Sequence, residues 1–163
     1  MNFIIFNLAD GSKKPCDLAN LSRSLSPNCE IVRMVGDKHE AIGFVCHKTL
    51  VHFAVESANY ALQNHSKEIL PKAQACIDLT RKWLEDSSSV SEEELNAAAY
   101  AAIYAANYAA YAAYAAYYAA YAVANVVANA ANAANAAANA AGKNKLNEQN
   151  RQGNFILKFF EVE

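Results

Sequence analysis

The chain has 163 residues, with 14 basic and 16 acidic side chains and a formal net charge of −2. A chain of this length suits one domain with a sizeable hydrophobic core. The near balance of charge argues against a nonspecific nucleic-acid binder, which needs a large positive excess, and against a strongly acidic mimic of DNA.

Strands are expected at both ends of the chain. Residues 2–8 are rich in β-forming side chains and end at a turn signal over 9–12. Residues 154–163 have the same character, and two short strands at opposite ends of a chain can satisfy their backbone groups by pairing. We therefore predict that these two strands pair, with 30–35 as a candidate third strand, and that 17–25 forms a short helix.

Helical patterns follow. Apolar side chains recur at helical spacing over 39–64. A second helix is expected over 66–85, interrupted at Pro71, which could equally be the first residue of its main part. After a polar linker, Ser91 and Glu94 have the spacing of a capping box, which predicts that a third helix begins at this point.

The stretch 95–141 contains no charged residue, histidine, glycine or proline, and is built almost wholly from Ala, Tyr and Asn. Ala is the strongest helix former, so we predict helix as far as Gly142, with a polar connector over 143–153 beyond it. The larger side chains recur every 3.55 residues or so, roughly the helical period, and therefore share one face. This stripe consists of Tyr100, Tyr104, Tyr108, Tyr111, Tyr114, Tyr118, Tyr121, Asn125, Asn129, Asn132, Asn135 and Asn139.

A straight helix over this stretch would be roughly 70 Å long, whereas a compact chain of this size has a radius of gyration of about 15 Å. The helix is therefore expected to bend, fold back or protrude. Its weakest span is 117–127, where bulky and β-branched residues lower helix propensity. An uncharged surface of methyl groups should pack on other helices or on a second copy of the chain, so a homo-oligomer is expected.

These patterns predict a mainly α protein, an Ala-rich helical bundle with a long or bent helix, plus a small β element that pairs the N- and C-terminal strands. One domain is expected over 1–163. It comprises a β and loop part at 1–36, a helical core at 39–142 and the C-terminal strand at 154–163.

The expected compartment is the cytoplasm. The N-terminus lacks the basic start and long apolar core of a signal peptide. No run reaches about 18 apolar residues without polar interruption, which argues against a membrane-spanning helix. The cysteines form no Cys-x-x-Cys pair and are expected to be reduced. They are Cys16, Cys29, Cys46 and Cys76.

The sequence carries no catalytic or metal-binding signature. His47 and His52, the closest histidines, are five residues apart and so do not share a helical face. Cys46 adjoins His47, but adjacent helical residues point in different directions and no third orienting group is identifiable. Phosphate-binding glycine loops and nucleophile elbows are absent as well. We therefore expect no enzymatic activity, no cofactor and no metal site.

The stripe is the candidate ligand site. Tyrosine offers ring faces and hydroxyls, and asparagine offers a donor and an acceptor that can bind a base edge. Two such helices around a cleft would suit a planar polar ligand such as a nucleotide, with Arg81, Lys82 and Arg33 as candidate counter-charges. In the alternative, the same side chains form only a packing layer between helices. The predicted ligand-binding residues are Tyr104, Tyr108, Tyr111, Tyr118, Asn125, Asn129, Arg81 and Trp83.

Several segments together resemble a known family. They are residues 50–62, the helix at 69–84 with Arg81, Lys82 and Trp83 near its end, the Ser/Glu linker at 89–95 and the Ala-Ala-Tyr repeats. This combination is similar to the alanine-rich helical immunity-protein domain associated with bacterial polymorphic toxins, copies of which also occur in bacteriophage genomes.

The resemblance implies a helical, non-enzymatic protein that protects its carrier by binding. We expect a phage counter-defence protein in the host cytoplasm that sequesters a nucleotide immune signal in a cleft lined by Tyr and Asn. The alternative is an immunity-type inhibitor that binds and blocks a toxin or effector protein. A third possibility, an enzyme that acts on a nucleotide, has no recognisable catalytic residues. No nucleic-acid or membrane partner is expected.

Overall fold

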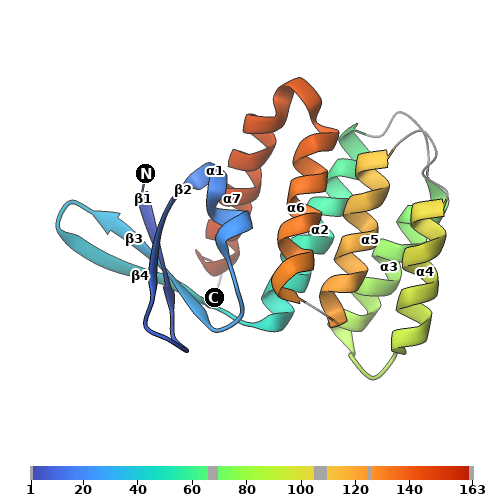
Figure 1. The fold of residues 1–163 in the computed structure, drawn as a ribbon, viewed down its shortest axis with the longest axis horizontal. Coiled ribbons are helices and arrows are strands. Elements are labelled where there is room, and N and C mark those ends of the chain that lie inside the picture. The colour runs from blue at the N-terminus through green and yellow to red at the C-terminus, as the bar shows by residue number, and fades with distance from the viewer. Residues whose placement is uncertain (1, 66–69, 105–109, 125, 162–163) are drawn as a thin grey trace.

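The computed structural model describes residues 2–65, 70–104, 110–124 and 126–161 and shows a mainly α protein with a small antiparallel sheet (Figure 1). The N-terminal elements are β1 (Asn2–Asn7), β2 (Lys13–Asp17), α1 (Leu18–Ser24), β3 (Cys29–Val35) and β4 (Lys38–Val45). The helices that follow are α2 (His47–His65), α3 (Pro71–Glu85), α4 (Glu92–Tyr104), α5 (Ala110–Ala124), α6 (Val126–Ala140), the 3-10 turn Gly142–Asn144 and α7 (Lys145–Glu161).

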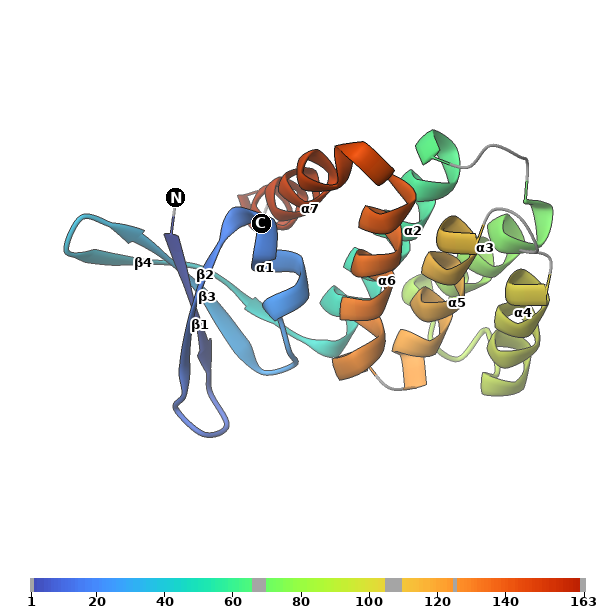
Figure 2. The same ribbon diagram turned by 45° about the horizontal axis from the view of Figure 1, so that its top comes forward.

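The sheet has the strand order β2-β1-β3-β4, and all neighbours are antiparallel. The strands predicted at 2–8 and 30–35 are confirmed as β1 and β3, which pair with each other. Phe3, Ile5 and Ile31 alternate along these strands and are buried on the face that α1 and α7 cover (Figure 2). The sheet thus contributes one face to the hydrophobic core.

The helix predicted to begin at 39 is wrong in its first part, because 38–45 is the strand β4. Val35 and Lys38 pair across a two-residue loop in which Gly36 has a φ of +60°, a conformation that glycine adopts at little cost. Further along β4, a Cβ at Gly43 would overlap the ring of Phe160 on α7. Pairing with β3 holds 38–45 in the sheet, the small Gly43 lets β4 pack against α7, and α2 begins only at His47.

The prediction that a C-terminal strand pairs with the first strand is also wrong, and so is the prediction of a polar connector over 143–153. Residues 145–161 form α7, while β1 pairs with β2 and β3. The buried residues of α7 recur at helical spacing and include Gln149, Gln152, Gly153, Ile156 and Leu157. Burial of this stripe outweighs the β preference of the neighbouring aromatic residues, since that preference spans only about 1 kcal/mol.

Local signals mark several helix ends correctly. Asp17 caps the predicted helix α1 by accepting a hydrogen bond from the backbone N–H of Asn20 at 2.9 Å. Pro71 is the first residue of α3. The capping box of α4 is confirmed, because the N–H of Ser91 donates to the Glu94 carboxylate at 2.9 Å and the N–H of Glu94 donates to Ser91 Oγ at 3.2 Å.

The alanine-rich stretch forms three helices, α4, α5 and α6, which lie side by side (Figure 1). α5 ends at Ala124 and α6 begins at Val126, so one change of direction falls within the span predicted for the bend. Another, between Tyr104 and Ala110, falls outside that span. α6 ends at Ala140, and Gly142 follows with a φ of +56°, as predicted for the helix stop.

Alanines make close packing between these helices possible. Ala115, Ala116, Ala119 and Ala122 on α5 are fully buried, and α5 packs against α2, α3, α4 and α6. On α6, Ala133 is fully buried as well. The chain's own helices therefore cover much of the methyl surface that the sequence left without a partner.

Candidate functional site

Tyrosine side chains on α4 and α5 form an open aromatic surface. Tyr100, Tyr111 and Tyr114 are 51%, 54% and 38% exposed, and Tyr117, Tyr118 and Tyr121 are half-buried. On α5 these positions share one helical face, and the opposite face carries the buried alanines. We define the tyrosine face as Tyr100, Tyr111, Tyr114, Tyr117, Tyr118 and Tyr121.

The rings of the tyrosine face support one another. The ring centroid of Tyr100 on α4 lies 6.4 Å from that of Tyr117 and 6.3 Å from that of Tyr121 on α5. Tyr117 and Tyr121 are 4.6 Å apart, and Tyr114 stacks on Tyr118 at 6.3 Å. A hydrogen bond with Tyr100, together with burial, raises the pKa of Tyr121 far above its usual range, so this phenol stays neutral. Edge-to-face and stacked contacts of this kind stabilise an ordered surface.

The described asparagines of the stripe lie on α6, beside α5 instead of beyond it. Asn129 donates from Nδ2 to the backbone carbonyl oxygen of Tyr121 at 3.1 Å, which ties the start of α6 to the end of α5. Asn139 accepts a hydrogen bond from Lys145 Nζ at 2.8 Å. Asn132 is exposed. At Asn129 and Asn139 the amide therefore stabilises the fold, as the packing alternative expects.

Two other predicted site residues contact α2. Arg81 pairs with Glu56 at 2.8 Å and lies 3.9 Å from Asp78. The Trp83 ring centroid is 5.9 Å from that of His47. The structure therefore does not bring Arg81 and Trp83 together with the tyrosine face.

The remaining predicted positions divide into three groups. Tyr111 and Tyr118 belong to the tyrosine face. Tyr104 is the last residue of α4. Tyr108 and Asn125 lie outside the described residues. One of the proposed counter-charges, Arg33, is engaged by Glu40 and Glu161 at 3.4 and 3.9 Å.

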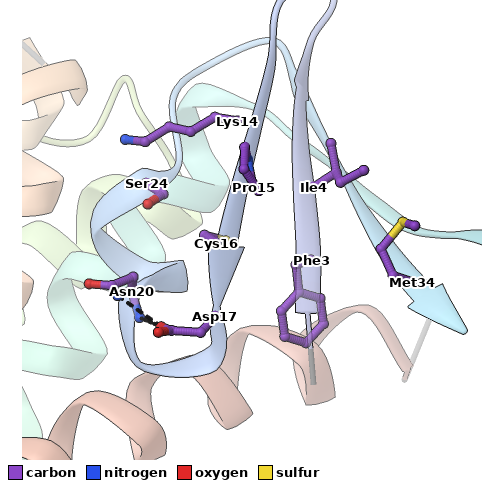
Figure 3. A pocket seen from close by; sticks show the side chains of 9 residues that line it. All are labelled: Phe3, Ile4, Lys14, Pro15, Cys16, Asp17, Asn20, Ser24 and Met34. Atoms are coloured by element: carbon purple, nitrogen blue, oxygen red, sulfur yellow. Dashed lines mark hydrogen bonds between the residues drawn. The ribbon is translucent and has the colours of Figure 1, made fainter.

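A groove of about 690 Å³ follows the edge strand β2, and Figure 3 shows the side chains that line it. Asp17 is already engaged, because its carboxylate accepts hydrogen bonds from the backbone and side-chain amides of Asn20, both at 2.9 Å. Cys16 is half-buried, and burial raises its pKa to about 11, so the thiol is neutral at physiological pH. Neither residue provides an activated nucleophile.

A polar surface along α7 was not expected from the sequence. A groove of about 480 Å³ on this helix, which we call the α7 groove, is lined by Asn147, Asn150, Arg151, Asn154, Phe155 and Lys158. Arg151 is fixed by two hydrogen bonds to Glu148, at 2.7 and 2.8 Å, and lies 3.6 Å from the ring centroid of Tyr60. The sequence does contain a signal for the α7 groove. Its polar residues recur at helical spacing, although most of them lie in the segment 143–153 that was predicted to be a connector.

Thiol reactivity should be concentrated at Cys46. Cys29 and Cys76 are buried, whereas Cys46 is exposed, with its Sγ 3.1 Å from Thr49 Oγ1. Partial burial raises the Cys46 pKa, but hydrogen bonds from Thr49 and nearby backbone N–H groups outweigh it and bring the pKa below its ordinary value. We expect iodoacetamide to alkylate Cys46 at least about tenfold faster than the other thiols, as measured by peptide mass mapping.

Substitution of single cysteines provides the control for the alkylation rate of Cys46. Cys46→Ser should remove the fast phase of alkylation, and Cys76→Ser should leave it intact. Equal rates at Cys16 and Cys46 would contradict the exposure and hydrogen bonding described above. Within the described ranges, no three His, Cys, Asp or Glu side chains gather in an arrangement that could hold a metal ion.

Comparison of the chain with protein-family models, with curated proteins and with solved structures finds no match. The resemblance to the immunity-protein family thus rests on the sequence segments alone. The fold and the surfaces define a class only, a mainly α protein with a small antiparallel sheet and an open tyrosine face. In the described part of the chain, no helix is both long and apolar enough to cross a lipid bilayer.

Proposed function

We propose that this chain is a non-catalytic, cytoplasmic binding protein that covers a surface of a partner protein with its tyrosine face, as an immunity-type inhibitor does. The exposure of Tyr100, Tyr111 and Tyr114 on a supported aromatic surface is the observation that carries this proposal. Tyrosine is enriched in protein interfaces and among the residues that dominate their binding energy.

The shape and charge of the tyrosine face favour a protein over a nucleotide. Binding pockets for small ligands typically enclose most of the ligand surface, whereas this face is open to solvent along α5. Residues 95–141 contain no Lys or Arg that could neutralise a phosphate, and Arg81 is paired with Glu56. An open, uncharged aromatic surface is instead suited to the desolvated centre of a protein interface.

A second candidate function is sequestration of a nucleotide immune signal by a phage counter-defence protein. The α7 groove favours it, because Lys158, which has no ion-pair partner among the described residues, supplies positive charge beside Phe155 and three asparagine amides, whereas Arg151 is paired with Glu148. Amides can bind a base edge, and Arg or Lys can bind phosphate. If the protein sequesters a nucleotide, its ligand site is the α7 groove and not the tyrosine face.

The decisive variant replaces the two tyrosines that can be changed with the least effect on packing. Tyr111→Ser with Tyr114→Ser should weaken a protein complex by about 100-fold or more, because central tyrosines are typical hot spots, while helicity is unchanged. The measurement is native mass spectrometry of the purified chain after incubation with extracts of defence-activated bacteria, followed by titration of any captured protein.

Lys158→Glu on α7 is the matched control. It should leave capture of a protein intact and should abolish binding of a small phosphate-bearing ligand. A discrete added mass in the nucleotide range, lost with Lys158→Glu and retained in the tyrosine variant, would reject the protein-inhibitor proposal in favour of sequestration. Stoichiometric capture of one protein, lost only in the tyrosine variant, is the expected result.

A further inference from the structure

The sheet has an apolar face that none of the described helices covers. Figures 1 and 2 show α1 and α7 on one side of the sheet and no labelled element on the other. Ile4, Phe6, Val32 and Met34 alternate with the buried inward-facing residues and are only partly buried, and Phe44 on β4 is 49% exposed. In Figure 3, Ile4 and Met34 lie on the other side of β1 from α1. Water-facing sheet surfaces normally carry polar residues at such positions, so this outer sheet face is suited to a partner.

The strand register places opposite charges on the two sides of β1 on this outer face. Phe6 pairs with Lys13 of β2 on one side and with Glu30 of β3 on the other. Lys13 Nζ lies 5.6 Å from the Phe6 ring centroid, and neither Lys13 nor Glu30 has an ion-pair partner among the described residues. In the next row, Ile4 pairs with both Pro15 and Val32. An apolar centre therefore lies between a positive and a negative flank.

We propose that the outer sheet face binds a second copy of this chain. In a face-to-face dimer with its two-fold axis parallel to β1, each β2 lies over the β3 of the other copy. Lys13 of each copy then faces Glu30 of the other, while Phe6 and Ile4 meet their own equivalents at the axis. A two-fold interface must be complementary to itself, and this arrangement of opposite charges on either side of β1 satisfies that requirement.

The size of the face sets the strength of the dimer. With the axis over β1, only β2, β1 and β3 overlap across the interface. Three strands at about 4.8 Å spacing and about 20 Å in length give a footprint of about 290 Å² per copy. This is well below the roughly 800 Å² per partner of a standard stable interface, so we expect a weak dimer with a dissociation constant on the order of 100 µM. Because the sheet and α4 lie at opposite ends of the molecule (Figure 1), the dimer would present two widely separated tyrosine faces.

The experiment is sedimentation equilibrium of the full chain from about 5 to about 500 µM, a range that spans the expected dissociation constant. The wild type should change from monomer to dimer over this range. Lys13→Glu alone and Glu30→Lys alone should each weaken the dimer at least about tenfold, because they place like charges opposite each other. The double variant K13E/E30K should restore it.

A mixture of the two single variants gives the sharpest result. Lys13→Glu and Glu30→Lys copies should form a heterodimer more tightly than either forms a homodimer, because both charge pairs across the axis are then attractive. The Tyr111→Ser and Tyr114→Ser variant should dimerise like the wild type. A monomer at every concentration, a dimer that does not respond to the charge exchanges, or one lost through the tyrosine substitutions would each overturn the proposal.

Discussion

Gly153→Ala should lower the free energy of unfolding by about 3 kcal/mol. Gly153 lies where α7 crosses α1, and an added Cβ would overlap the backbone carbonyl oxygen of Leu18 and lie 2.8 Å from Leu18 Cδ1. Backbone cannot move aside as a flexible side chain can, so α1 and α7 would have to separate. The measurement is guanidinium-induced unfolding followed by circular dichroism.

The direction of this effect is itself diagnostic. In an exposed helix interior, Gly→Ala stabilises by about 0.5–1 kcal/mol, because alanine loses less backbone entropy on folding. Asn154→Ala, at the adjacent exposed position, is the control and should change stability by less than about 0.5 kcal/mol. A Gly153→Ala protein as stable as the wild type would mean that α1 and α7 do not approach so closely.

Gln152→Leu should cost about 3 kcal/mol although it preserves most of the side-chain volume. The Gln152 amide is 2% exposed and connects three helices. Its Oε1 accepts from Ser22 Oγ at 3.0 Å, and its Nε2 donates to the Ala134 carbonyl oxygen at 3.1 Å and to Glu148 at 3.0 Å. Leucine would leave Ser22 without its acceptor and would remove a donor from a carboxylate that is only 2% exposed.

Gln149→Leu is the matched control for this polar network. Gln149 lies three residues earlier on α7 and is also buried, but its side chain makes no hydrogen bond among the described residues. The same substitution should therefore change stability by less than about 1 kcal/mol in either direction. Equal losses for the two variants in denaturant unfolding would show that leucine is rejected for its shape and not for the lost hydrogen bonds.

Nearest-neighbour signals account for the parts of the fold that could be predicted from the sequence. Asp17 before α1, Pro71 at the start of α3 and the Ser91–Glu94 capping box satisfy backbone groups within a few residues of themselves. Gly142 ends α6 for an equally local reason, since its positive φ strains residues that have a side chain. Such contacts do not depend on which other helices surround them.

The tyrosines of the candidate site were visible in the sequence, but their surroundings were not. Helical spacing correctly places Tyr111, Tyr114 and Tyr118 on one face of α5. Periodicity cannot show that Arg81 turns to Glu56 or that Asn129 binds the end of α5, because these contacts join residues of different helices. The α7 groove was missed because aromatic residues after 154 resemble a strand when read locally.

The sequence by itself determined the mainly α class, the caps and stops of several helices and the spacing of the tyrosines, because these depend on backbone groups within one or two turns. Only the tertiary structure decided that the alanine-rich stretch divides into helices lying side by side and that residues 145–161 form a helix. Close approach of small residues, such as Gly153 against Leu18 and the buried alanines against α2, supplies the reason. Packing of that kind outweighs a local preference of about 1 kcal/mol and becomes available only when distant segments meet.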